Sequence, residues 1–114
     1  MTAILLVEDD PKIRANLLFQ LRQEGWAPEA LESAEAALGR LAPGRGPAPD
    51  LLLLDVRLPG KSGIDLVRTL AEDGRLPPTV IISGEASIRE TVEALKLGVH
   101  DFIEKPFTTE RLAR

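Results

Sequence analysis

Three short stretches of this chain are continuously apolar. A continuous run, unlike the alternating pattern of a half-exposed strand, is typical of a strand buried on both faces of a covered parallel sheet. The three runs are Ala3–Val7, Leu51–Leu54 and Thr79–Ile82. Two weaker strand candidates are His100–Ile103 and Ala27–Leu31. We expect the latter to be an edge strand, because Pro28 has no amide donor to offer a second neighbour.

Amphipathic helical patterns lie between these runs. Apolar residues recur three or four positions apart in four stripes, each expected to face a core: Ile13, Leu17 and Leu21; Ala34, Ala37, Leu38 and Leu41; Ile64, Val67, Leu70 and Ala71; Ile88, Val92 and Leu95. Asp10 and Ser33 are suited to cap the first two helices, and Pro11 suits a first helical position. A fifth helix would begin at Thr108 or Thr109, near the end of the sequence.

The order of these elements predicts the fold. A strand followed by a helix, repeated five times, favours an α/β domain with an open, doubly wound parallel sheet and helices on both faces. The 114 residues suit one domain over residues 1–114, within which Ala42–Pro49 (APGRGPAP) forms a loop. In such sheets the functional site lies at the carboxyl ends of the strands.

Composition excludes several classes of function. The 14 basic and 18 acidic residues give a net charge of -4, which argues against duplex DNA or an anionic membrane as the main partner. The absence of cysteine excludes disulfides and thiolate metal sites. No apolar run approaches the ~18 residues of a membrane span, and the start lacks the basic region of a signal peptide. We expect a cytoplasmic protein that contacts neither nucleic acid nor membrane directly.

Ionisable and hydroxyl side chains follow the predicted strands: Glu8, Asp9 and Asp10 after the first, Asp55 after the third, Ser83 after the fourth and Lys105 after the last. Carboxylates gathered at one edge ~4 Å apart would repel by about 4 kcal/mol at an effective dielectric constant near 20. A divalent cation such as Mg²⁺ relieves that repulsion. Asp55 is the best candidate nucleophile for an acyl phosphate, with Lys105 and Ser83 as partners for phosphoryl oxygens.

Each of these residues also has a purely structural interpretation. Asp9 and Asp10 precede a proline and could serve only to cap a helix. Asp55 could be a turn residue, Ser83 the start of a loop and Lys105 a solvated lysine. The functional interpretation rests on the combination, in which every buried run ends in a residue suited to the same chemistry.

Four motifs occur in order: Leu5–Asp10 (LLVEDD); Leu51–Asp55 (LLLLD) with Leu58-Pro59-Gly60 and Gly63; Val80–Gly84 (VIISG); and Asp101–Phe107 (DFIEKPF). Together they resemble the receiver domains of two-component response regulators, and the resemblance covers the whole chain. It implies a flavodoxin-like, five-stranded parallel sheet of order 2-1-3-4-5, with the last helix cut short where the sequence ends. It also implies an N-terminal module of a longer regulator.

The resemblance implies a metal site and a phosphoacceptor. Asp55 would accept a phosphoryl group from a phosphohistidine of a sensor histidine kinase. Asp10 and Asp55 would ligate Mg²⁺ directly, with the backbone carbonyl of Arg57, and Asp9 would act through a water. Mn²⁺ would be able to replace Mg²⁺ at this site.

The resemblance also implies a switch. Lys105 and Ser83 would contact the phosphoryl oxygens, and Pro106 would follow a cis peptide bond. On phosphorylation Ser83 would move toward the phosphate and Phe102 would rotate inward. The face made by the fourth helix, the last strand and the fifth helix would then change its partner preference.

Some positions depart from the commonest pattern of the family. The hydroxyl residue Ser83 replaces threonine, and the switch aromatic Phe102 replaces tyrosine, which removes a hydroxyl. Arg57 and Glu85 stand where the family tunes dephosphorylation, and a pair between them is a hypothesis. The segment Ser83–Phe107 looks most like receivers of the nitrogen-regulation group, whose output domains are an AAA+ ATPase and a DNA-binding domain.

Two alternatives stay open beside the phosphorylation-dependent switch. One is a degenerate receiver that binds partners without phosphorylation. The other is a hydrolase with an aspartyl-phosphate intermediate, although the chain lacks a second carboxylate two residues after Asp55, where such an enzyme would carry its acid/base. In the favoured interpretation the domain acts on itself and is not an enzyme with turnover. Its partners are a sensor kinase, an output domain in the same chain and a second copy in a homodimer.

Overall fold

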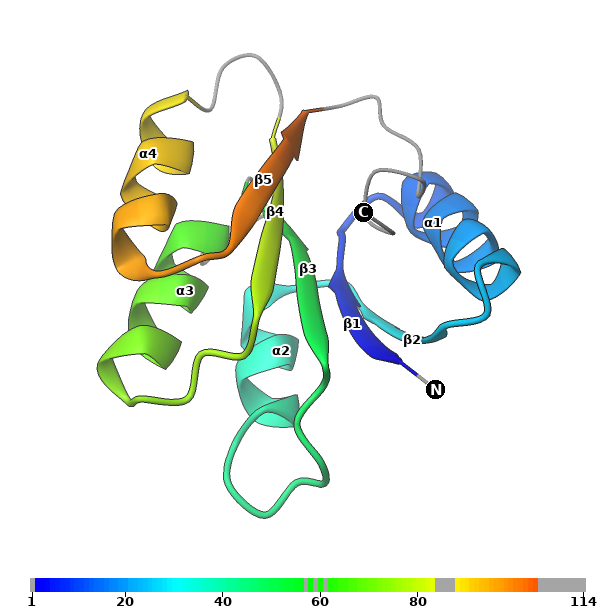
Figure 1. Ribbon diagram of the computed structural model, residues 1–114, viewed down its shortest axis with the longest axis horizontal. Coiled ribbons are helices and arrows are strands. Elements are labelled where there is room, and N and C mark those ends of the chain that lie inside the picture. Colours follow the sequence, from blue (N-terminus) through cyan, green and yellow to red (C-terminus); the bar gives the residue numbers. More distant parts are fainter. Residues whose placement is uncertain (1, 57, 59, 61, 84–87, 105–114) are drawn as a thin grey trace.

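The computed structural model describes residues 2–56, 58, 60, 62–83 and 88–104, with the backbone alone described at 83, 88 and 104. Strands and helices alternate along the chain (Figure 1). In order they are β1 (Ala3–Val7), α1 (Pro11–Gln23), β2 (Ala27–Leu31), α2 (Ala34–Arg40), β3 (Leu51–Asp55), α3 (Gly63–Glu72), β4 (Thr79–Ser83), α4 (Ile88–Leu97) and β5 (Asp101–Glu104). The predicted fifth helix lies outside the described residues.

The five strands form one parallel sheet in the order β2-β1-β3-β4-β5. This confirms the predicted order, and it confirms Ala27–Leu31 as an edge strand. The register pairs Val7 with Leu54 and Asp55 with Ile82, so the carboxyl ends of β1, β3 and β4 meet at one edge. None of the described helices is long and apolar enough to span a membrane.

Side chains on alternate positions of the strands build two cores, one on each face of the sheet. Leu5, Val7 and Leu54 face the side covered by α2, α3 and α4. Ile4 and Leu6 face the opposite side, on which Leu17 and Leu21 of α1 pack. Figure 1 shows α1 across the sheet from the other three helices. Continuous apolar strands are therefore needed, because neither face of the sheet is exposed to water.

The helix starts follow the capping expected from the sequence. The Oδ1 of Asp10 accepts hydrogen bonds from the backbone N–H groups of Lys12 (2.8 Å) and Ile13 (3.2 Å), with Pro11 as the first helical residue. Ser33 accepts from the backbone N–H of Ala36 and caps α2 in the same way. These contacts satisfy amide donors that have no partner inside the helix.

The expected core stripe of α4 is wrong. Val92 and Leu95 are 47% and 40% exposed, whereas Thr91 and Ala94 are buried. Helical periodicity locates an apolar face, but it does not say whether a protein core covers that face. The described part of α4 therefore packs on its neighbours through Thr91, Ala94 and, at its end, partly buried Leu97, and presents Val92 and Leu95 to solvent.

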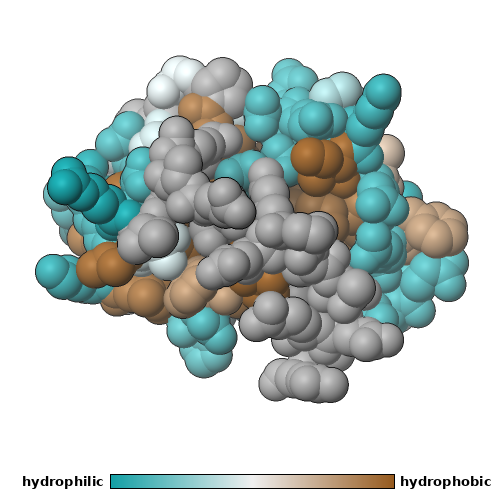
Figure 2. All heavy atoms as spheres, turned by 90° about the horizontal axis from the view of Figure 1, so that it is seen from above, coloured by the Kyte–Doolittle hydropathy of each residue, from teal (hydrophilic) through white to brown (hydrophobic). Residues whose placement is uncertain are grey.

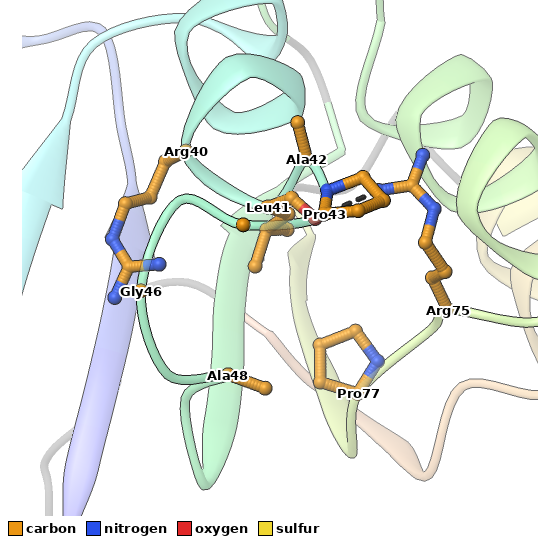
Figure 3. Close-up of a pocket in the computed structure, with 9 residues that line it drawn as sticks. Arg40, Leu41, Ala42, Pro43, Gly46, Ala48, Arg75 and Pro77 are labelled. Carbon is orange, nitrogen blue, oxygen red and sulfur yellow. Dashed lines mark hydrogen bonds between the residues drawn. The ribbon is translucent and has the colours of Figure 1, made fainter.

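The loop after α2 is tied to the body of the domain by two arginines. The Nη1 of Arg75 donates to the carbonyl of Leu41 at 2.7 Å, and the Nη2 of Arg40 donates to the carbonyl of Pro47 at 3.1 Å. A cavity of about 270 Å³ lies between the loop and the start of β4. Figure 3 shows the two guanidinium groups on opposite sides of this cavity. Because both groups already bond to the chain, we interpret this edge of the sheet as structural.

Replacing Arg75 by alanine should lower the free energy of unfolding by about 1–2 kcal/mol, because the partly buried carbonyl of Leu41 loses its donor. Urea unfolding measures the change as a lower midpoint with an unchanged slope. Arg45→Ala on the exposed loop is the control and should shift stability by less than about 0.5 kcal/mol. Equal midpoints for the two variants would show that the bond to Leu41 carries no stability.

Candidate functional site

Asp55 is the last residue of β3 and is 5% exposed. Its position is set by the sheet, because the next residue, Val56, donates its N–H to the carbonyl of Ile82 in β4 at 3.1 Å. A carboxyl group this buried is unusual unless it is paired or serves a site. The sheet therefore places a buried acid at the edge where its strands end.

Two other acids join Asp55 at this edge. One carboxylate oxygen each from Glu8, Asp9 and Asp55 lies within 4.8 Å of the others. Glu8 is 1% exposed, and Asp9 is exposed to solvent. At such a separation two ionised carboxylates repel by about 3–4 kcal/mol at an effective dielectric constant near 20. Three acids in this arrangement suit a bound cation, which would offset their repulsion.

The acid triad Glu8–Asp9–Asp55 differs from the pair expected from the sequence. Asp10, expected as a direct metal ligand, instead uses its Oδ1 to cap α1. Glu8 takes its place in the group and also accepts from the backbone N–H of Asp10 at 3.3 Å. The sequence carries a signal for Glu8, which directly follows the first apolar run and precedes the two aspartates. The structure therefore brings Glu8 and Asp9, and not Asp10, into the group with Asp55.

The donor set of the triad suits a hard divalent cation. Mg²⁺ binds oxygen ligands at about 2.0–2.1 Å and usually takes one or two carboxylates while keeping several waters. Three carboxylate oxygens within 4.8 Å of each other can share such an ion directly or through water. Among the described residues, this triad is an acidic pocket that could hold such an ion.

Hydrogen bonds to its backbone carbonyl groups also hold the turn that carries Glu8 and Asp9. The Nη1 of Arg14, one turn into α1, donates to the carbonyl of Glu8 at 2.9 Å and to that of Asp9 at 3.3 Å. The N–H of Glu8 donates to Leu31 at the end of β2. The backbone of both acids is therefore fixed by contacts outside the carboxylates themselves.

The start of α3 packs against the backbone that follows Asp55. The N–H of Gly63 donates to the carbonyl of Val56 at 3.1 Å. A Cβ added to Gly63 would lie 2.5 Å from the carbonyl oxygen of Asp55 and 2.6 Å from Cδ1 of Leu54, closer than real contacts allow. Glycine is therefore required here for the close approach of two backbones.

A capping box fixes this first turn of α3. The Oγ of Ser62 accepts from the N–H of Asp65, and the Oδ2 of Asp65 accepts from the N–H of Ser62, both at 3.2 Å. The pKa of Asp65 is lowered, first because of the backbone hydrogen bond from Ser62 and then by its hydroxyl, with Arg68 adding to the effect. The segment between Asp55 and α3 is thus anchored at its helical end.

Several predicted site residues lie outside the described residues: Arg57, Glu85, Lys105 and Pro106. For Ser83 the backbone is described, and it is the last residue of β4, one position beyond the partner of Asp55. Phe102 on β5 is partly buried and packs against the core that α2, α3 and α4 cover. Figure 2 looks onto the end of the molecule at which the strands finish, where hydrophilic side chains border apolar ones.

Comparison with known proteins matches this fold and site to one family. The model of the response regulator receiver domain matches residues 4–114. The chain belongs to this family, the receiver domains of two-component response regulators, which serve phosphorylation-based signalling. The resemblance stated from the four sequence motifs is therefore confirmed.

Relatives of this chain include several transcriptional regulators. It is 36% identical over 109 residues to the two-component response regulator PhoP of Pseudomonas aeruginosa. It is 37% identical over 111 residues to the nitrogen assimilation regulatory protein NtrX of Azorhizobium caulinodans and to the phosphate regulon regulatory protein PhoB of Escherichia coli. The matches cover 96% of this chain but 47%, 24% and 47% of these relatives. The chain thus spans less than half of their length.

Solved structures agree with the assignment. The crystal structure of FixJ-N has a TM-score of 0.88 at 33% identity, covering 99% of this chain and 88% of that one. The receiver domain of NtrX from Brucella abortus has a TM-score of 0.83 at 34% identity, covering 96% and 91%. Nitrogen-type regulators stand among the relatives beside phosphate-type ones, so the nitrogen-regulation subgroup stays a prediction.

Proposed function

We propose that this chain is a phosphorylation-dependent switch in which Asp55 accepts a phosphoryl group from a sensor histidine kinase. The observation that carries the proposal is the burial of Asp55 at the carboxyl end of β3, within 4.8 Å of two further acids. A lone buried carboxylate could be structural, but three together at the functional edge of an α/β sheet favour a charged ligand. The family supports the same interpretation.

In the proposed reaction a carboxylate oxygen of Asp55 bonds to phosphorus, while the bond from phosphorus to the histidine nitrogen of the kinase breaks. The histidine ring of the kinase carries a proton on its other nitrogen, so it leaves as neutral imidazole, and the product is an acyl phosphate. When bound, Mg²⁺ would supply positive charge beside the phosphoryl oxygens and would so stabilise the transfer electrostatically. Asp9 and Asp55 are suited to hold the ion directly and Glu8 through water; the Arg57 carbonyl and Mn²⁺ as a substitute ion remain expectations.

Other residues would contact the phosphoryl group on Asp55 or respond to its presence. We assign Lys105 and Ser83 to the phosphoryl oxygens and Phe102 to the switch, as the family resemblance implies. Phosphorylation would change the face formed by α4, β5 and the following helix, with Arg57 and Glu85 tuning how long the phosphate lasts. The role of the domain is signalling on itself, without turnover of a separate substrate.

The partners follow from the same proposal. Because the chain spans less than half of its relatives, we propose a longer cytoplasmic regulator with a transcriptional output domain. In the nitrogen-regulation variant that output would be an AAA+ ATPase followed by a DNA-binding domain. A homodimer through the switch face would be a further partner. The described domain itself would contact neither DNA nor membrane.

Incubation with acetyl phosphate and Mg²⁺ tests the proposal, with intact-mass spectrometry as the readout. The wild-type chain should gain a single phosphoryl group, and Asp55→Asn should gain none. A degenerate receiver would show no adduct in the wild-type chain. Rapid, repeated release of phosphate from phosphomonoesters would instead support the hydrolase alternative and would contradict the proposal of a phosphorylation-dependent switch.

A further inference from the structure

A chain of polar contacts leads from the peptide after Asp55 to α4. It begins where the N–H of Gly63 donates to the carbonyl of Val56 and continues through the capping box of Ser62 to Asp65. The two carboxylate oxygens of Asp65 have separate donors: Oδ2 accepts from the backbone of Ser62, and Oδ1 accepts from Nη1 of Arg68 at 3.0 Å. The other amino group of Arg68, Nη2, donates to Oε1 of Glu93 in α4.

Arg68 therefore joins two helices with one guanidinium group. Figure 1 shows α3 and α4 lying side by side, and the two helices are in contact. A planar guanidinium can serve two carboxylates in fixed directions, which an ammonium cannot do. The pKa of Arg68 is raised, first by its hydrogen bond with Glu93 and then by the charges of Glu93 and Asp65. The raised pKa of Arg68 therefore agrees with its two contacts to carboxylates.

The apolar attachment of α4 is slight compared with that of α3. Among its described side chains α4 contributes buried Ala94 and partly buried Leu97 to the core, whereas α3 contributes Ile64, Leu66, Val67 and Leu70. A helix whose described side chains contribute so few apolar residues to the core is more easily displaced. Polar links at its side then account for a larger share of what holds it in place.

We propose that Arg68 is a positioning residue that couples the placement of α4 to the phosphoacceptor end of β3. This inference rests on the proposed function, in which α4 changes its placement when Asp55 is phosphorylated. In the proposal, this shift weakens the contact between Arg68 and Glu93, which joins α4 to α3. A variant that lacks the contact should populate the shifted placement of α4 more often before any phosphodonor is added, and this population shift should favour phosphorylation of Asp55.

The solvent exposure of the Arg68 and Glu93 side chains limits how much their contact can change the phosphorylation of Asp55. The side chains of Arg68 and Glu93 are 40% and 48% exposed, and ion pairs of this kind are worth little in water. We therefore expect Arg68→Gln and Glu93→Gln each to speed phosphorylation by about two- to five-fold at low salt. The double variant should do no more than either single one, and Arg68→Lys should fall between wild type and Arg68→Gln.

Two measurements test the proposal. Amide hydrogen exchange, without phosphodonor, should be about two- to five-fold faster in α4 of Arg68→Gln and Glu93→Gln. The rate of modification by acetyl phosphate and Mg²⁺ should rise in the same variants. Glu29→Gln is the matched control: it breaks the ion pair with Arg40 on the far edge of the sheet, and Glu29 is 49% exposed. It should change neither readout.

The outcomes separate the two proposals. Unchanged exchange in α4, or faster exchange spread evenly over the domain, would overturn the role of Arg68. Faster exchange in α4 with an unchanged modification rate would overturn the coupling. If the wild-type chain takes up no phosphoryl group, the proposed function fails, and exchange in α4 then decides by itself whether Arg68 positions that helix.

Discussion

Replacing Gly63 by alanine should lower the free energy of unfolding by about 2–4 kcal/mol. The added methyl group would lie 2.5 Å from the carbonyl oxygen of Asp55 and 3.0 Å from Cα of Val56, both parts of the backbone. Neither can move without disturbing β3, so the cost falls at the upper end of that for overpacked sites. Chemical denaturation measures the loss, and the rate of phosphorylation should fall with it because the peptide of Asp55 shifts.

Gly39→Ala is the matched control for Gly63→Ala. Gly39 lies near the end of α2, and a Cβ added there would meet nothing within 4 Å. Alanine is the better helix former, so this variant should gain up to about 1 kcal/mol. The two substitutions make the same chemical change with opposite expected signs. If both variants kept wild-type stability, the close packing of α3 on β3 would not be limiting.

The second large effect concerns the metal. Wild-type protein should be stabilised by Mg²⁺, by about 2.7 kcal/mol at a concentration one hundred times the dissociation constant. Asp9→Asn should lose most of this gain, because it removes one charge from the triad that would hold the ion. Without Mg²⁺ the same variant should be more stable than wild type, since one like charge has gone. Thermal melts at several Mg²⁺ concentrations measure both changes.

Asp10→Asn provides the contrast. Asparagine caps helices about as well as aspartate, so the contacts to Lys12 and Ile13 should survive and stability should hardly change. Its response to Mg²⁺ should stay close to that of wild type. If Asp10→Asn lost the response and Asp9→Asn kept it, the assignment of the triad would be reversed in favour of the original expectation from the sequence.

Much of the fold is predictable because strands that are buried on both faces of a sheet are continuously apolar in sequence. Continuous apolar runs located β1, β3 and β4, and the proline in Ala27–Leu31 correctly marked an edge. The strand order followed from the family resemblance. Periodicity failed for α4 because Val92 and Leu95 form an apolar face that no described part of the domain covers.

The sequence predicts at which edge of the sheet the site lies, but it does not predict which of the acids there form the site. Adjacent acids after β1 all suit a cation, and a sequence does not say which side chain turns toward Asp55. The backbone decides this: Asp10 is the N-cap of α1, so its carboxylate accepts from the amide groups of the first turn. Glu8 is still in line with the strand and turns into the triad. The bridge through Arg68 could not be read from the sequence, because it depends on two helices lying side by side.

The turn between β1 and α1 is held twice, by Asp10 accepting from amide groups ahead of it and by Arg14 donating to carbonyl groups behind it. None of these bonds involves the carboxylates of Asp9 or Asp55. The fold, and not the ion, therefore holds the acidic pocket in its shape. A zinc finger differs in this respect, because it unfolds without its metal. A chelator should strip the cation from this domain and leave a folded protein, ready to rebind the ion without a folding step.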